Sequence, residues 1–198
     1  MPCDVQLVFA LVAPIGADLT NVNQLLEDFL KSVGHEPRFV RLTDSFNLTR
    51  EQRDKSDGKK YYKRLMDSGD ELRRTHKNKA AVAMFAVAEI DEIRNGESEN
   101  PVSVILHQLK TPEEVSELRR IYGNRLVVLA GHSSRENRVN SLSVKLAQMA
   151  ADSRSLNFRS KAESLISRDE KDDRSISFLE AGHCSQFDAT RNSARQPS

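Results

Sequence analysis

Residues 5–19 read VQLVFALVAPIGADL, and this stretch decides the fold class. Its first nine residues are almost all apolar, which is typical of a strand that is buried on both faces in a parallel sheet. A short turn follows, and apolar residues then recur at helical spacing as far as Gly34. Residues 38–42 read as a second short strand. Strand, loop, helix and strand in this order predict a βαβ unit.

The same alternation continues along the chain. Further strands are predicted at residues 102–106 and 125–131, and helices at residues 63–74, 79–94, 111–122, 133–149 and 158–173. This order predicts an α/β fold in which helices cover both faces of a parallel sheet. Residues 1–173 are assigned to this domain. Residues 174–198 show no helical or strand period, so we expect an unstructured tail there.

Composition limits the function classes. Hydrophobic residues make up 38% and charged residues 30% of the chain, a balance that supports a packed core and a soluble surface. The formal net charge is only +1, so nucleic-acid binding would need a local basic patch. Cys3 and Cys184 give no disulfide framework, and no apolar run approaches the length of a membrane span. With no signal peptide apparent at the start, we expect a cytoplasmic protein without a membrane partner.

The loop after the first strand has the setting of a phosphate-binding loop. The motif G-x-x-x-x-G-K-[ST] lies between a strand and a helix in P-loop NTPases and kinases, and its lysine and backbone amides hold phosphates. Aligning Gly16 with the second glycine places Ala17 at the lysine and Asp18 at the hydroxyl residue. Gly16, Ala17, Asp18 and Leu19 therefore predict a degenerate P-loop that holds an anion weakly. The alternative is a structural turn in which Asp18 or Thr20 caps the helix.

Three arginines are further candidates for phosphate binding. Arg41 ends the second strand, near the edge at which α/β sheets bind ligands. Arg135 and Arg138 follow the fourth strand, in a region where P-loop kinases place arginines that contact phosphates. The alternative for each arginine is an ordinary solvated helix face.

A second basic segment suggests nucleic acid. Lysines 59, 60 and 63 flank Tyr61 and Tyr62. This combination suits nucleic acid, because bases stack on aromatic rings and phosphates contact lysines. A solvated helix face is the alternative. The nearby acidic residues at positions 67, 70 and 71 could bind a metal, although pairing with arginines along the same helix is the simpler interpretation.

Several collinear blocks resemble one known family. They are LVAPIGADL (11–19), GHEPRFVRLTDSF (34–46), RLMDSGDELR (64–73), the long block SVILHQLKTPEEVSELRRIYGNRLVVLAG (103–131) and LISRDEKDD (165–173). The chain is similar over about residues 5–173 to the bacterial anti-phage deoxycytidylate (dCTP) deaminases. Members of that family join an N-terminal P-loop-kinase-like domain to a C-terminal zinc deaminase domain. The resemblance implies that this chain corresponds to the first domain, which is thought to control the deaminase as it drains deoxycytidine nucleotides during infection.

The motifs of the zinc site are missing. Zinc deaminases use H-x-E and P-C-x-x-C for their metal ligands and proton-transferring glutamate, and none of the five histidines begins an H-x-E. We therefore expect no zinc and no deaminase activity from this chain alone.

The resulting hypothesis is a truncated family member with a non-catalytic or regulatory role. Its expected partners are a nucleotide or a small RNA, together with a separate deaminase domain or a second copy of the chain. No cofactor other than a nucleotide is expected. The alternative is a divergent nucleotide kinase or phosphohydrolase in which Arg41 or Arg135 replaces the missing lysine.

Overall fold

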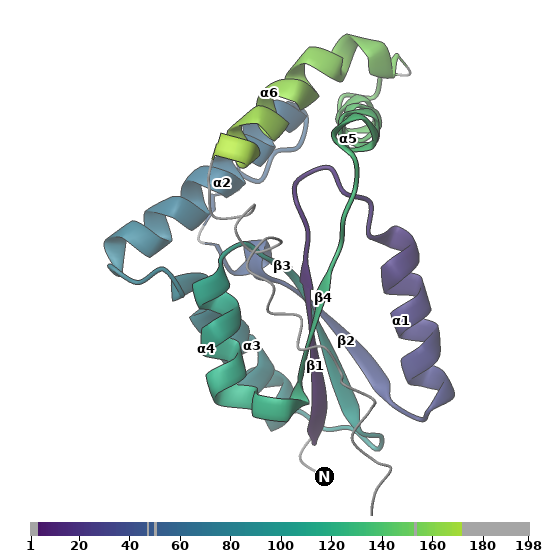
Figure 1. Ribbon diagram of the computed structural model, residues 1–198, viewed down its shortest axis with the longest axis vertical. Coiled ribbons are helices and arrows are strands. Elements are labelled where there is room, and N and C mark those ends of the chain that lie inside the picture. The colour runs from purple at the N-terminus through teal and green to yellow at the C-terminus, as the bar shows by residue number, and fades with distance from the viewer. Residues whose placement is uncertain (1–3, 47, 50, 153, 172–198) are drawn as a thin grey trace, which may run out of the picture.

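The fold is built on one four-stranded parallel sheet with the strand order β2-β3-β1-β4 (Figure 1). A computed structural model describes residues 4–46, 48–49, 51–152 and 154–171. In the sheet, β1 (Val5–Val12) pairs with β3 (Val102–Leu109) on one side and with β4 (Leu126–Ala130) on the other. β2 (Glu36–Arg41) pairs with β3 at the far edge. The predicted α/β fold is confirmed, and the predicted tail at residues 174–198 lies outside the described residues.

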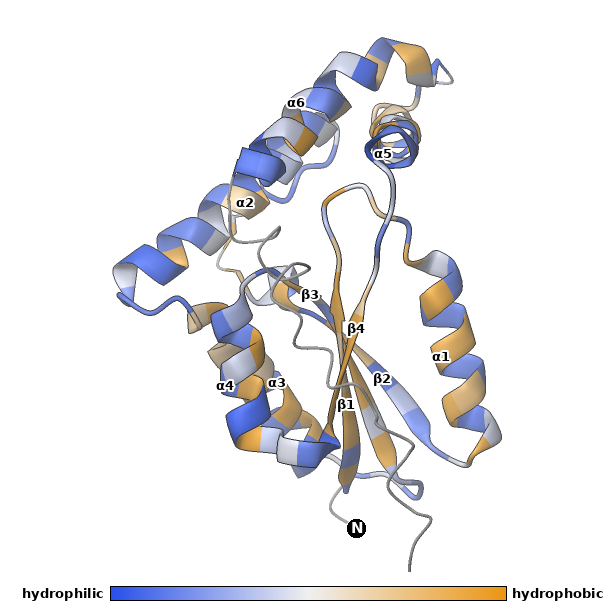
Figure 2. Cartoon of the chain, viewed as in Figure 1, coloured by the Kyte–Doolittle hydropathy of each residue, from blue (hydrophilic) through white to orange (hydrophobic). Residues whose placement is uncertain are grey.

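Helices cover both faces of the sheet, as the apolar first strand predicts. On one face, Phe9 and Leu11 pack in a cluster with Leu30 of α1 (Thr20–Ser32). On the other face, Val8 and Ala10 belong to the cluster that contains buried residues of α3 (Ala81–Asn95) and α4 (Pro112–Tyr122). Figure 2 shows mainly apolar residues along β1 and β4 and a more polar edge strand β2, with helices on either side of the sheet. Because successive residues of β1 point to opposite faces, both sets have to be apolar.

Three further helices lie beyond the carboxyl ends of the strands (Figure 1). They are α2 (Gly58–Thr75), α5 (Arg135–Met149) and α6 (Arg159–Lys171). Leu142, Leu165 and Ile166 form a hydrophobic cluster there, and Ile15 of the loop after β1 is buried in it. The connecting 3₁₀ helices are η1 (Leu42–Ser45), η2 (Gly123–Arg125) and η3 (Ser155–Phe158). Within the described ranges, no helix is both long enough and apolar enough to cross a membrane.

Local capping explains where the helices begin. α4 begins with a capping box, in which Thr111 and Glu114 exchange side-chain and backbone hydrogen bonds. The helix predicted from residue 133 begins at Arg135, because the side chain of Ser134 accepts a hydrogen bond from the backbone of Asn137. The helix predicted from residue 63 begins earlier, at Gly58, because the Asp57 side chain accepts a hydrogen bond from the Lys60 backbone N–H.

Gly16 permits the tight approach of the first loop to α5. Its φ angle is +84°, in the left-handed region that favours glycine. A Cβ atom at this position would lie 2.6 Å from the backbone oxygen of Arg138. The glycine thus serves a packing role that requires no bound phosphate.

Replacing Gly16 by alanine is expected to lower the free energy of unfolding by about 1–3 kcal/mol or more, because a left-handed non-glycine residue is strained. The contact with the Arg138 carbonyl adds to that cost. Gly34→Ala is the matched control, since Gly34 has φ +79° and open space around its Cβ position. Urea denaturation should show a larger loss for Gly16→Ala than for Gly34→Ala. Equal losses would show that the close approach to α5 contributes nothing.

Candidate functional site

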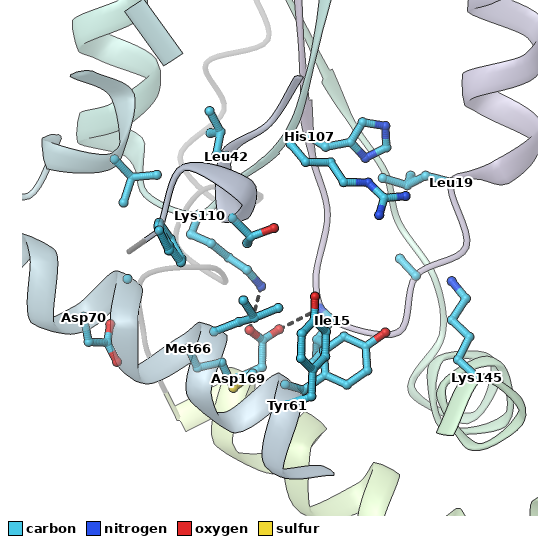
Figure 3. A pocket seen from close by; sticks show the side chains of 18 of the residues that line it. Ile15, Leu19, Leu42, Tyr61, Met66, Asp70, His107, Lys110, Lys145 and Asp169 are labelled. Carbon is cyan, nitrogen blue, oxygen red and sulfur yellow. Dashed lines mark hydrogen bonds and ion pairs between the residues drawn. The ribbon is translucent and has the colours of Figure 1, made fainter. Parts of the chain in front are cut away.

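A cavity of about 360 Å³ lies where β1, β2 and β3 end, beneath the layer of α2, α5 and α6 (Figure 3). Its position follows from the topology. The chain leaves β1 through α1 on one face of the sheet, whereas it leaves β3 through α4 on the other face. Such a switch point between neighbouring parallel strands opens a crevice at their carboxyl ends. The volume is within the range of small-molecule sites, about 300–1,000 Å³.

The loop after β1 reaches this cavity, and the backbone amides of Ile15 and Ala17 already have partners. The Ile15 N–H donates to the Asp169 carboxylate at 2.8 Å, and the Ala17 N–H donates to the Pro14 carbonyl at 3.1 Å. Asp18 accepts hydrogen bonds from the Thr20 hydroxyl and backbone N–H, and these bonds hold the pKa of Asp18 below its usual range. These hydrogen bonds match the alternative interpretation of this segment, in which the loop is a structural turn before α1.

The four residues predicted to form a degenerate P-loop, 16–19, have different positions relative to the cavity. Ala17, Asp18 and Leu19 line the cavity, whereas Gly16 is placed against α5. Ala17 and Leu19 are also buried in the core cluster beneath α1. A lysine at the Ala17 position would need to leave that core to reach a phosphate. The packing therefore explains why this loop carries alanine where the full motif carries lysine.

Arg41 lines the cavity at the carboxyl end of β2. Its side chain makes no hydrogen bond or ion pair with any residue of the described ranges. The other cations of the wall do have neighbours: Lys110 pairs with Asp169 at 2.8 Å, and Lys145 lies 3.9 Å from Asp18. Lys55 also has no ion pair among the described residues, but it lies over the Tyr61 ring, so Arg41 and Lys55 are the two cations of the lining that can accept an anionic ligand without first losing an ion pair.

His107 stands beside Arg41, because the two residues are register partners on β3 and β2. Burial lowers the pKa of His107, and the nearby Arg41 charge lowers it further. The Nε2 atom lies 2.9 Å from the side-chain oxygen of Asn23. A neutral imidazole at pH 7 can donate or accept a hydrogen bond without adding charge to the cavity.

The lowered pKa of His107 predicts a pH-dependent stability. The folded chain binds this proton less readily than the unfolded chain, so stability is full above the ordinary histidine pKa of about 6.5 and falls as the pH drops below it. In urea denaturation at several pH values, wild type should lose more stability on acidification than His107→Gln. The exposed His76 provides the control, since His76→Gln should retain the wild-type pH profile. Parallel profiles for wild type and His107→Gln would contradict the lowered pKa.

The charge of the cavity wall favours an anion. Five basic and three acidic side chains line it: Arg41, Lys55, Arg73, Lys110 and Lys145, with Asp18, Asp70 and Asp169. The lining thus carries a formal charge of +2 while His107 is neutral. A cleft of one charge sign between low-dielectric walls concentrates ions of the opposite sign.

Aromatic and apolar side chains also line the cavity. Tyr61 and Tyr62 both line the cavity, with their rings 5.7 Å apart in an edge-to-face arrangement. Lys55 lies over the Tyr61 ring at 5.6 Å, and burial raises the pKa of Tyr62. Phe46 is a further residue of the lining. The two tyrosines of the predicted nucleic-acid patch therefore line the cavity.

Arg135 and Arg138 do not line the cavity. Arg138 is buried and donates to Glu170 of α6 at 2.5 Å, while its Nε and Nη1 atoms have no hydrogen-bond partner among the described residues. Arg135 lies at the surface and contacts the side chains of Glu170 and Ser167. α6 folds back over the start of α5, so both arginines join these two helices. The acidic residues of α2 also have partners, and no group of metal-binding side chains occurs in the described part of the chain.

No protein-family model matches the chain, and no curated protein is significantly similar to it. The chemistry of the site therefore has to be inferred from its own residues.

Sequence reasoning missed three of the residues that define the site: His107, Lys110 and Asp169. For two of them a signal existed, because His107 and Lys110 stand at the end of the third predicted strand, where ligands bind. Asp169 had no such signal, since only the packing of α6 brings it to the first loop.

Proposed function

We propose that this chain is a non-catalytic, regulatory nucleotide-binding domain whose ligand occupies the cavity at the carboxyl edge of the sheet. The observation that carries the proposal is the position of Arg41. Its guanidinium has no hydrogen-bond or ion-pair partner in the described ranges, and Arg41 lines a cavity whose lining carries a net positive charge. A planar guanidinium fits phosphate oxygens with two parallel hydrogen bonds.

The aromatic side chains of the lining support a nucleobase. The rings of Tyr61, Tyr62 and Phe46 provide flat apolar surfaces at which a base can stack. Lys55 and Lys145 add positive charge to the same cavity. A ligand that joins an aromatic base to a phosphate matches this combination of aromatic and cationic side chains. A long RNA matches it less well, because the aromatic rings are inside the cavity.

A regulatory role is favoured over phosphoryl transfer. Phosphoryl transfer relies on a lysine and free loop amides that stabilise the charge of the transferred group. Here Ala17 replaces the lysine, and the Ile15 amide is bound to Asp169. Binding without turnover requires neither feature. A divergent kinase or phosphohydrolase remains the rival function.

The relation to anti-phage deoxycytidylate deaminases belongs to the same proposal. Its support is the set of collinear sequence blocks, together with a parallel α/β sheet whose first loop carries the degenerate motif. In this proposal the domain senses a nucleotide and passes the signal to a deaminase partner. A C-terminal catalytic domain is not needed for the sensing step.

Isothermal titration calorimetry with the four dNTPs, ATP, the matching nucleosides and a short RNA tests the proposal. At least one nucleotide should bind, and its nucleoside should bind about tenfold or more weakly, since charge-assisted hydrogen bonds contribute about 1.5–3 kcal/mol. A parallel assay for released phosphate with Mg²⁺ should stay at background. Binding to none of these ligands would overturn the proposal, and nucleotide turnover abolished by Arg41→Ala would replace it with the rival function.

A further inference from the structure

The Asp169 carboxylate binds a backbone amide of the first loop and a lysine ammonium at the same time (Figure 3). One of its oxygens accepts the Ile15 N–H at 2.8 Å, and the other lies 2.8 Å from the Lys110 ammonium. Asp169 is 6% exposed and lines the cavity. A backbone amide after a first strand and a nearby lysine are the two kinds of donor with which phosphate-binding loops hold their ligand.

Ion pairs of Arg168, Asp169 and Glu170 hold the last turn of α6 against the elements around it. On either side of Asp169, Arg168 donates to Asp67 of α2 at 2.6 Å, and Glu170 accepts from Arg138 of α5 at 2.5 Å. Three successive residues of α6 thus bind four parts of the chain around the cavity, which are α2, α5, the loop after β1 and Lys110 after β3. α6 is the last described element, and residues 172–198 follow it in the chain.

We propose that Asp169 is a built-in competitor for the phosphate of the ligand, so that binding of a phosphorylated ligand displaces it and loosens the last turn of α6. This inference rests on the proposed nucleotide-binding function and adds a means of regulation to it. A phosphate carries more negative charge than a carboxylate and has more acceptor oxygens for the Ile15 amide and Lys110. The two anions repel each other within the cavity, so both cannot keep the same donors.

The test compares Asp169→Asn with Glu163→Gln. Glu163 also lies on α6, and its replacement by glutamine also removes one negative charge. Its partner, however, is Arg159 of the same helix. Calorimetry with inorganic pyrophosphate and with ATP gives the affinities, and hydrogen exchange of the amides of residues 168–171 reports on α6. Asp169→Asn should bind both anions about tenfold more tightly than wild type, because removing a like charge removes its repulsion. Without ligand, these amides should exchange about tenfold faster than in wild type, which is the scale of one charge-assisted hydrogen bond.

Lys110→Met gives an independent check, because it should also speed exchange of the α6 amides while weakening anion binding. ATP should speed the same amides in wild type and in Glu163→Gln. ATP binding without any change in α6 exchange would overturn the competitor role and leave the proposed function intact. Asp169→Asn exchange equal to wild type, or weaker anion binding by this variant, would also overturn it. If neither anion binds wild type or Asp169→Asn, the nucleotide-binding function itself fails, and the competitor role fails with it.

Discussion

Arg73→Met is expected to lower the free energy of unfolding by about 3–5 kcal/mol, because it leaves a buried carboxylate without its cation. That carboxylate is Glu114 of α4, whose side chain is fully buried. Arg73 of α2 donates to its Oε1 atom from Nε at 3.0 Å and from Nη2 at 2.7 Å. The other oxygen accepts the backbone N–H groups of Lys110 and Thr111 at 2.8 and 3.1 Å. The pair therefore joins α2, α4 and the end of β3 at one point.

Two further variants make this prediction specific. Arg74→Met removes the neighbouring arginine, which pairs with Glu71 on the exposed face of α2, and should leave the urea midpoint almost unchanged. The double variant Arg73→Met/Glu114→Gln should be more stable than Arg73→Met alone, because the unpaired buried charge is gone. A loss of less than about 1 kcal/mol for Arg73→Met would contradict the role assigned to the pair, since removing one partner of a buried pair costs more.

Arg41→Gln is expected to weaken nucleotide binding by about 10- to 100-fold, because hydrogen bonds to a charged phosphate contribute about 1.5–3 kcal/mol. Glutamine keeps hydrogen-bonding capacity and most of the side-chain length, but it removes the charge. Arg41 has no ion pair in the described part of the chain, so the urea midpoint should change little. Titration calorimetry of the tightest-binding nucleotide measures the effect.

Arg38→Gln is the matched control for Arg41→Gln. Arg38 lies on the same strand and pairs with Glu36 at 2.5 Å, and it does not line the cavity. Its replacement should leave nucleotide affinity at the wild-type value. If both variants lose affinity equally, general charge would explain the binding. If neither loses affinity, the phosphate lies elsewhere.

The sequence predicted those features that depend on local pattern. The almost entirely apolar run at residues 5–13 indicated burial on both faces, and the two core clusters confirm it. Arg41 was placed at the edge of the sheet by its position at the end of a strand, and the structure shows it in the wall of the cavity. Both inferences used periodicity and strand order, which are properties of neighbouring residues.

The sequence could not predict contacts that depend on how distant elements fold together. Asp169 reaches Ile15 across 154 residues, through the packing of α6 against α5 and α2. The same packing buries Arg138 against Glu170 and removes it from the set of cavity residues. Tyr61 and Tyr62 appeared in a basic, solvated segment, but the packing of α2 over the carboxyl ends of the strands places both in the lining of the cavity.

The imidazole of His107 offers the most direct test that the cavity is the ligand site. Its ring nitrogens can be followed by NMR during titration with the tightest-binding nucleotide, with assignment from His107→Gln and with exposed His76 as the internal reference. An anion beside Arg41 offsets the positive charge that helps to lower the pKa of His107, so binding should shift the His107 signals and raise that pKa. The His76 signals should stay unchanged. Saturation with nucleotide while the His107 signals and pKa remain as in the free protein would contradict the account.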